Sequence, residues 1–404
     1  MSISICKTLY QLKSSIRNSP THYICFAQIR SFLSSLASVN QTPNQPSFTV
    51  NYLINSCGFP LEKAITASKH INFETPENPD SVIAFLCNHG FTKTQALNVI
   101  RKVPQVIVSN PEKTLLPKLE FFKSKGVSST DVVKILSLSP NLLIRSLDNQ
   151  IIPSFEFFKN LIGSEERALS AIKRFAGPLL VDLKSRMTPN VDILREVNVP
   201  DAKIVYLLAY HPRVFMSSCE RFRQIVEEVK GMGFNHLKMT FVLAIYALNS
   251  MSKPSWEKKI EAYKKWGFSE DVILVAFGKY PLFMMVSEDK ITRVMDFLVN
   301  KMGLESSCVS KRPRLLSYSF EKRIVPRCLV YQALQAKGLI KKPIIIFMML
   351  TSTEMWFIEK VVNLTKEEAP EILKLYEEKL AIARFPSPAH PGNLAVEFSH
   401  YLLL

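Results

Sequence analysis

The sequence has few of the residues that build metal sites and nucleophilic active sites. Its seven cysteines never lie closer together than nineteen residues, and no two of its seven histidines are four residues apart. Those spacings exclude the usual zinc motifs and the histidine pair of a metalloprotease. The single Gly-x-Gly, Gly231-Met232-Gly233, does not belong to a phosphate-binding loop. We therefore expect no catalysis, no metal and no cofactor.

Long apolar runs are also missing. Ile344 to Leu350 has seven residues and the longest run, Phe241 to Leu248, has eight, whereas a helix needs about twenty to cross a bilayer. We expect no contact with a membrane.

Carboxylates are absent from residues 1–47, which contain four Lys and Arg residues. Ile5, Leu9, Leu12 and Ile16 make one apolar stripe of a helix there. A basic, serine-rich, acid-free amphipathic leader is typical of an organellar import peptide. We predict import into mitochondria, with the chloroplast as the alternative destination and a disordered arm as the alternative to import.

Glycine is rare, and its twelve occurrences are not spread at random. Eight of them recur every 32 to 37 residues once Asn198 fills the one gap: Gly58, Gly90, Gly126, Gly163, Gly233, Gly267, Gly303 and Gly338. Glycine and asparagine tolerate the left-handed conformation just past a helix end. These nine residues are therefore predicted to be helix C-caps, one for each repeat of about 35 residues.

Prolines form a second grid. One set, which we call the first slot, holds Pro104, Pro140, Pro212, Pro281 and Pro313. Three of these, Pro104, Pro140 and Pro313, are followed thirteen residues later by a proline of the second slot: Pro117, Pro153 and Pro326. Proline lacks the amide donor and costs about 3 kcal/mol inside a helix. Each of these prolines is therefore predicted to stop or start a helix.

The two grids predict an all-α helical-repeat solenoid of about nine units, each made of helix, tight turn and helix. It would be a curved superhelix, whose hand the sequence leaves open. We expect one repeat domain over residues 48–380, after the import peptide at 1–47, and a disordered or atypical tail at 381–404. Thr92 with Gln95 forms the sequence pattern of a capping box at the start of one helix.

Two stretches carry the repeat motif most clearly, VPQVIVSNPEKTLLPKLEFFK at 103–123 and SPNLLIRSLDNQIIPSFEFFK at 139–159. The motif resembles that of the mitochondrial transcription termination factor (mTERF) family, plant branch, over residues 50–380. The resemblance implies a helical-repeat protein that acts on organellar DNA or RNA. By period alone, a pentatricopeptide or tetratricopeptide array is the alternative.

Positive charge is the abundant feature. The net charge is +16, and +12 remains without the leader, which favours binding to the phosphate backbone of nucleic acid. Seven cations stand just before a first proline slot or its equivalent, and one just after it: Arg101, Lys102, Lys173, Arg174, Lys279, Lys311, Arg312 and Arg213. Residues at one register of a solenoid share a surface, so these eight are our candidate nucleic-acid-binding residues. The alternative is that they only complement helix dipoles, worth about 0.3–1 kcal/mol each.

The expected function is that of an organellar nucleic-acid-binding protein that binds double-stranded DNA and regulates mitochondrial transcription, at termination or initiation, without catalysis. RNA binding that assists intron splicing and a protein-interaction scaffold are the alternatives. Few aromatic residues recur at an exposed register, which favours duplex over single strands. We expect a monomer whose partners are organellar DNA or RNA, and organellar transcription or splicing proteins.

Overall fold

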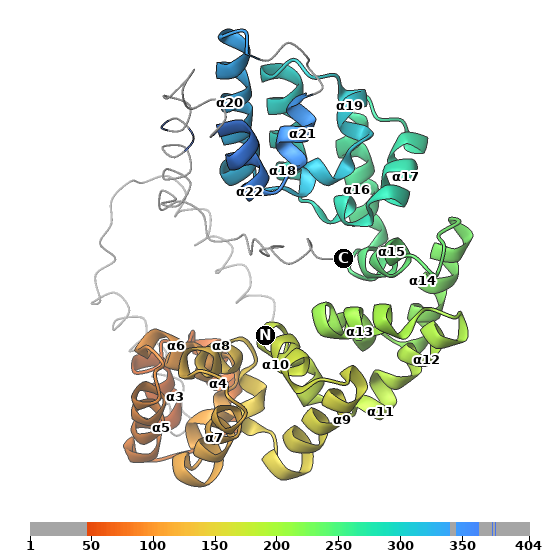
Figure 1. Ribbon diagram of the computed structural model, residues 1–404. Coiled ribbons are helices and arrows are strands. Elements are labelled where there is room, and N and C mark those ends of the chain that lie inside the picture. Colours follow the sequence, from red (N-terminus) through yellow and green to blue (C-terminus); the bar gives the residue numbers. More distant parts are fainter. Residues whose placement is uncertain (1–46, 340–344, 363–373, 375, 377–404) are drawn as a thin grey trace, which may run out of the picture. The chain divides into compact units, whose positions relative to one another are not determined.

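The structure is a computed structural model that describes residues 47–339, 345–362, 374 and 376 (Figure 1). These residues form helices and no strand, so the all-α prediction is confirmed for them. The predicted import peptide (except its last residue) and the predicted 381–404 tail lie outside the described residues. Within the described part, no helix is both long and apolar enough to span a bilayer.

Contacts divide the chain into two compact units, one ending at Pro111 and one beginning at Glu112. In the first unit, α3 (Phe48–Asn55) packs against the helix that follows it, around a core that contains Leu53, Ala64 and Ile100. The boundaries predicted for a single repeat domain remain a prediction.

Each repeat begins with what we call its first helix. In chain order the first helices are α4 (Leu61–Ser68), α6 (Lys93–Lys102), α8 (Ser129–Leu138), α10 (Glu165–Arg174), α13 (Asp201–Tyr210), α15 (Met239–Asn249), α17 (Glu270–Lys279), α19 (Ser306–Ser310) and α21 (Ile345–Thr351). The predicted capping box opens α6, because the side chains of Thr92 and Gln95 each accept a hydrogen bond from the backbone amide of the other.

A second helix completes each repeat. These helices are α5 (Glu77–Asn88), α7 (Leu116–Ser124), α9 (Ile152–Ile162), α12 (Thr188–Glu196), α14 (Cys219–Gly231), α16 (Lys253–Lys264), α18 (Glu288–Met295), α20 (Val325–Ala336) and α22 (Glu354–Phe357), with the short α11 (Leu183–Arg186) before α12. π-helical turns, η9 (Asp296–Lys301) and η12 (Ile358–Val362), extend α18 and α22.

The prolines of the first slot end the first helices as predicted. Each is the first residue of a 3-10 turn, namely η2 (Pro104–Val108), η4 (Pro140–Ile144), η7 (Pro212–Met216), η8 (Pro281–Met285) and η10 (Pro313–Ser317). A further 3-10 turn, η6 (Gly177–Leu180), takes the same place where Ala176 replaces the proline. The missing amide is no loss at this position, because the first residues of a helix need no intrahelical donor.

The prolines of the second slot are the second residues of α7, α9 and α20, so helix starts are confirmed there. The sequence did not predict that a π-helical turn runs directly into each of these helices: η3 (Pro111–Leu115), η5 (Leu147–Ile151) and η11 (Phe320–Ile324). The amide of Ile152 donates to the carbonyl of Leu147, five residues back. The proline thus lies where the hydrogen-bond pattern changes, and its missing donor breaks no regular α-helical ladder.

All nine predicted C-caps adopt the left-handed conformation. The eight glycines of the grid have positive φ, and Asn198, with φ of 58°, is the one residue other than glycine that does so in the described part of the chain. Gly163, for example, has φ of 76°, and a Cβ added to it would meet no atom within 4 Å. Backbone conformation, and not space, therefore selects glycine at these positions.

Gly163→Ala should lower the free energy of unfolding by about 1–2 kcal/mol, because a Cβ is strained in the left-handed region. Gly278 is the matched control, since it lies within α17 without positive φ and has open space for a Cβ. Gly278→Ala should leave stability unchanged or raise it by up to about 1 kcal/mol. Urea denaturation measures both, and an equal loss in the two variants would refute the assignment of Gly163 as a conformational cap.

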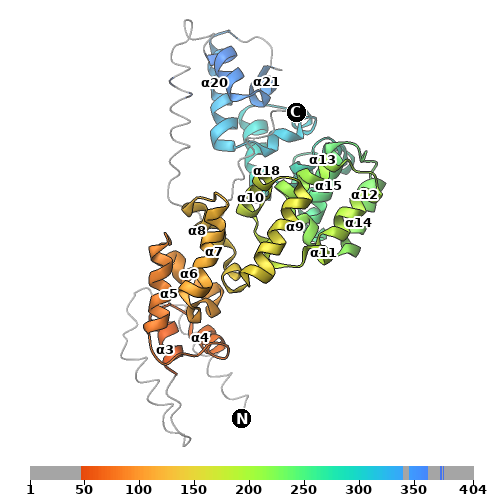
Figure 2. The ribbon, with the colours of Figure 1, turned by 60° about the horizontal axis from the view of Figure 1, so that its bottom comes forward.

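The repeats of the second unit stack through like helices. Among first helices, α8 packs on α10, α10 on α13, α13 on α15, α15 on α17 and α17 on α19. Among second helices, α12 packs on α14 and α16 on α18, as Figure 2 shows for the first of these pairs. Stacking of this kind buries a continuous core that no single repeat could form.

Polar side chains of the second helices also join neighbouring repeats. They donate to main-chain carbonyls in or near the turn of the next repeat, and these bonds include Lys118 to Leu143 (2.5 Å), Asn190 to Phe215 (3.0 Å), Lys290 to Ser317 (3.0 Å) and Arg327 to Met349 (2.6 Å). The last carbonyls of a short turn lack helical donors. These polar residues of the second helices therefore join neighbouring repeats by hydrogen bonds as well as by packing.

Candidate nucleic-acid interface

The predicted binding residues of the second unit lie at the ends of first helices and in the turns that follow them. We call this surface the C-terminal edge and define it by Lys173, Arg174, Arg213, Lys279, Lys311, Arg312 and Arg314. Arg314 was not among the predicted residues. All except Lys173 and Arg312 are exposed, and those two are partly exposed.

Contacts between repeats hold part of this edge together. Arg174 donates from Nη2 to the carbonyl of Ala209 at 2.5 Å, which joins the end of α10 to the end of α13. Its guanidinium also lies 5.1 Å from the ring centroid of Tyr210. The ring of His211 stacks on Tyr246 with centroids 3.8 Å apart, which joins α13 to α15. The C-terminal ends of these first helices are therefore neighbours, as the repeat register predicted.

His211 supplies no positive charge at this edge near neutral pH. Burial, assisted by the nearby Arg174 charge, lowers the pKa of its imidazole to about 4. We therefore assign it to packing between repeats.

Arginine guanidinium groups cover several aromatic faces along the edge and beside it. Arg213 lies 4.7 Å from the centroid of the Phe175 ring, and Arg312 lies 4.3 Å from that of Phe347. A guanidinium stacked on a ring keeps its N–H donors in the plane, where they remain available to a phosphate. The rings beneath are correspondingly less available to stack with a nucleic-acid base.

Lys173 is committed to a contact within the protein. Its Nζ lies 2.8 Å from Oδ2 of Asp131, at the start of α8, and hydrogen bonding to Lys173 lowers the pKa of that carboxyl. Because Lys173 and Arg174 both join repeats, replacing them would alter helix packing as well as surface charge.

The cations of the second helices differ from those of the edge because several have carboxylate partners. Arg223 pairs with Glu196 at 2.8 Å, and Lys264 lies 3.2 Å from Glu261 and 3.4 Å from Glu270. Among the described residues, no carboxylate lies within ion-pairing distance of Arg213, Lys279, Lys311, Arg312 or Arg314. These five cations of the edge therefore present uncompensated positive charge.

The excess of positive charge is concentrated in residues 301–339. Residues 301–339 contain eight Lys and Arg against two carboxylates, whereas residues 48–300 contain thirty-two against twenty-five. Counting charge by segment would have found this asymmetry from the sequence, and it would have added Arg314 to the candidates.

Part of the net charge is not available to a ligand. Lys118, Arg323 and Arg327 donate to main-chain carbonyls, and the side chain of Arg327 is fully buried. Burial lowers the pKa values of Lys118 and Arg323. Net charge alone therefore overstates the positive surface.

The first unit holds the remaining two predicted residues. Arg101 and Lys102 form the exposed last turn of α6, directly before the turn that begins at Pro104. They occupy the same register in their repeat as Lys173 and Arg174 in theirs.

Stacked helix pairs with proline turns and a basic edge define a helical-repeat protein suited to binding a polyanion. The sequence pattern of the mTERF family matches residues 83–298 and 247–358, and the chain belongs to this family, whose members bind nucleic acid without catalysis. The resemblance read from the proline motif is thereby confirmed.

Two curated relatives come from Arabidopsis thaliana. The chain is 20% identical over 277 residues to the chloroplastic transcription termination factor MTERF8. The aligned stretch covers 67% of this chain and 54% of that protein. The chain is 23% identical over 167 residues to the mitochondrial transcription termination factor MTERF15, covering 41% and 36%. The chain thus spans about half the length of the first relative and about a third of the second.

Proposed function

We propose that this protein binds organellar double-stranded DNA through the C-terminal edge and regulates transcription, at termination or initiation, without chemistry of its own. The observation that carries the proposal is a contrast between two groups of cations. Several on the second helices have carboxylate partners, whereas among the described residues no carboxylate lies within ion-pairing distance of Arg213, Lys279, Lys311, Arg312 or Arg314 on the edge. Exposed cations without carboxylate partners, at one register, attract phosphates, and binding then releases the counterions of the nucleic acid. A protein held on the duplex in this way could obstruct or position a polymerase.

Duplex DNA is favoured over single-stranded RNA by the state of the aromatic rings. Single-strand binders stack bases on exposed rings, whereas Phe175 and Tyr210 lie beneath guanidinium groups. Phosphate contacts, which need no access to the rings, suit this edge better.

Replacing Lys279 and Lys311 together by glutamine should weaken binding to every duplex sequence alike. The salt slope is the change in the logarithm of affinity with the logarithm of salt concentration. Each lost phosphate contact should reduce the size of this slope by about one unit, so the double variant should lose about two. Stability should change by less than about 0.5 kcal/mol, because both side chains are exposed. Fluorescence anisotropy with labelled duplex at several salt concentrations measures the slope.

The matched control is Arg223→Gln with Lys264→Gln, which removes the same charge from cations that have carboxylate partners. Its salt slope should remain close to that of the unaltered protein. Equal loss in the two double variants would show that total charge, and not the edge, governs binding.

We further propose that the protein acts in mitochondria. The support is the acid-free leader with its apolar stripe and basic residues, and one relative is named as mitochondrial while the other is named as chloroplastic. Residues 1–47 fused to a fluorescent protein should enter mitochondria. Fluorescence in chloroplasts would assign the other organelle, and fluorescence confined to the cytosol would reject import.

A further inference from the structure

The middle of helix α17, from Val272 to Phe277, is apolar around its whole circumference, yet three of its six residues are exposed. Ile273, Ala276 and Phe277 face the core, whereas Val272, Leu274 and Val275 are 37%, 43% and 58% exposed. A helix that is apolar all round is normally buried on all sides. The outer face of α17 therefore has the composition of a covered surface.

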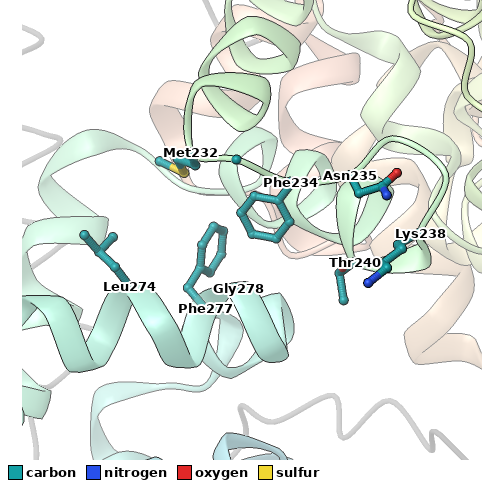
Figure 3. Close-up of a pocket in the computed structure, with 9 residues that line it drawn as sticks. Met232, Phe234, Asn235, Lys238, Thr240, Leu274, Phe277 and Gly278 are labelled. Atoms are coloured by element: carbon teal, nitrogen blue, oxygen red, sulfur yellow. The ribbon is translucent and has the colours of Figure 1, made fainter.

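A pocket of about 320 Å³ opens beside this face (Figure 3). Leu274 and Phe277 of α17 line it together with Met232 and Phe234, which precede α15. Met232 is 39% exposed, and the nearby Leu237, outside the lining, is 56% exposed. Val272 and Val275 are exposed on the same helix outside the pocket lining, so a small ligand in the pocket would leave them in water.

We propose that this surface, which we call the α17 groove, binds an amphipathic α-helix of a partner protein. A helix can insert one or two apolar side chains into the pocket and cover the stripe along α17 at the same time. Exposed apolar surfaces of this kind mark protein interaction sites. The inference does not depend on nucleic-acid binding.

Charge at the two ends of the groove specifies the partner further. Asp271 lies at the N-terminal end of α17 beside Glu270, which is 3.4 Å from Lys264, and Lys238 lines the pocket beyond Gly278, near the C-terminal end of α17 (Figure 3). Among the residues that the structure describes, no carboxylate lines the pocket. A partner helix that runs antiparallel to α17, with carboxylates in its first turn and cations in its last, would meet opposite charge at both ends. Its helix dipole would also lie antiparallel to that of α17, which is favourable.

The test uses the full chain and two synthetic peptides of about sixteen residues with the same apolar stripe. One carries glutamates in the first turn and lysines in the last, and the other exchanges them. The first should bind at least about fivefold more tightly in fluorescence anisotropy, and Lys238→Glu should reduce or reverse that preference. Equal binding of both peptides, or no binding of either, would overturn the proposal.

Val272→Gln with Val275→Gln should weaken binding of the first peptide at least tenfold. Leu138→Gln is the matched control, because Leu138 is a 58% exposed residue on another first helix, and it should leave peptide affinity unchanged. Circular dichroism melting should show that all variants fold. Equal affinity for the double variant and the control would contradict the assignment to α17.

Two other occupants give distinct results, and either would overturn the proposal. A second copy of the chain would produce a dimer in sedimentation that the double valine variant abolishes. The chain's own residues 381–404 would block the groove, so that their removal would raise peptide affinity. The proposal predicts a monomer and no effect of that removal.

Discussion

Replacing Arg327 by methionine should lower the free energy of unfolding by about 3–5 kcal/mol. The Arg327 side chain is fully buried, and its Nη1 donates to the carbonyls of Met349 at 2.6 Å and Ser352 at 2.8 Å. Methionine has a similar length but no donor, so the two carbonyls would lose their charged partner. The Ser352 carbonyl would still accept from Arg323 and the Met349 carbonyl from the Ser352 hydroxyl, so the loss is that of two hydrogen bonds from a charged donor, each worth about 1.5–3 kcal/mol.

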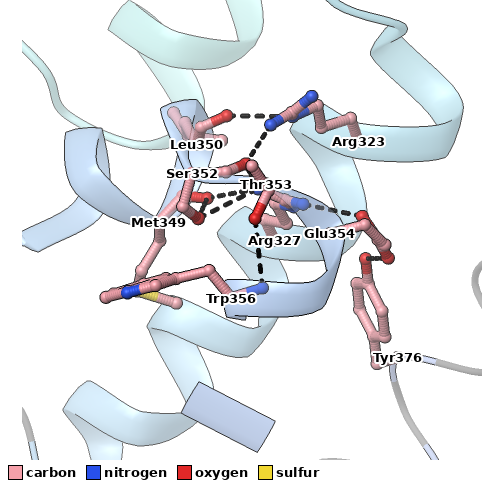
Figure 4. Close-up of polar contacts among 9 residues, drawn as sticks. All are labelled: Arg323, Arg327, Met349, Leu350, Ser352, Thr353, Glu354, Trp356 and Tyr376. Atoms are coloured by element: carbon pink, nitrogen blue, oxygen red, sulfur yellow. Dashed lines mark hydrogen bonds and ion pairs between the residues drawn. The ribbon is translucent and has the colours of Figure 1, made fainter. Parts of the chain in front are cut away.

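Figure 4 shows the surroundings of this side chain. Nη2 of Arg327 lies 2.6 Å from Oε2 of Glu354, whose other oxygen accepts from the Tyr376 hydroxyl at 2.5 Å. Arg323 donates to Leu350 and Ser352. The two arginines thus hold α21 and α22 against η11 and the start of α20, so their loss should loosen the last described repeat.

Glu354→Gln is the control for this prediction. The Glu354 side chain is about half exposed, so water can replace its contact and the amide can still accept from Arg327. We expect a loss below about 1 kcal/mol. Guanidinium denaturation followed by circular dichroism compares the two variants, and a loss below about 1 kcal/mol for Arg327→Met would contradict a structural role for this buried cation.

The sequence predicted the repeat boundaries because they depend on local backbone chemistry. A left-handed residue after a helix requires glycine or asparagine, and all nine such positions, including Asn198, were identified by spacing. A proline likewise ends a helix through its own backbone chemistry, and Pro140 and Pro281 end helices as predicted.

The sequence could not assign each cation to a role, because that depends on what lies opposite in the neighbouring repeat. Lys173 and Lys311 occupy nearly the same register, yet Lys173 faces Asp131 of another helix whereas Lys311 has no carboxylate partner among the described residues. Arg327 has the chemistry of a phosphate ligand but is fully buried. The π-helical turns that lead into α7, α9 and α20 were also missed, because the prolines mark the start of each α-helix and not of the helical turn before it.

The other prediction with a large expected effect concerns the salt dependence of duplex DNA binding. If six cations of the C-terminal edge meet phosphates, the logarithm of duplex affinity should fall with the logarithm of salt concentration with a slope of about −5. Raising salt from about 50 to about 200 mM should then weaken binding roughly a thousandfold. The six are Arg174, Arg213, Lys279, Lys311, Arg312 and Arg314. A protein-interaction scaffold that buries apolar surface would show far weaker salt dependence.

The most direct test of the proposed nucleic-acid binding is therefore a salt titration of the purified protein with a labelled DNA duplex, repeated with the Lys279→Gln and Lys311→Gln double variant. The account predicts a slope of about −5 for the unaltered protein and about −3 for the variant, whatever the duplex sequence. Absence of duplex binding at about 50 mM salt, or a slope near zero that the variant does not change, would contradict it.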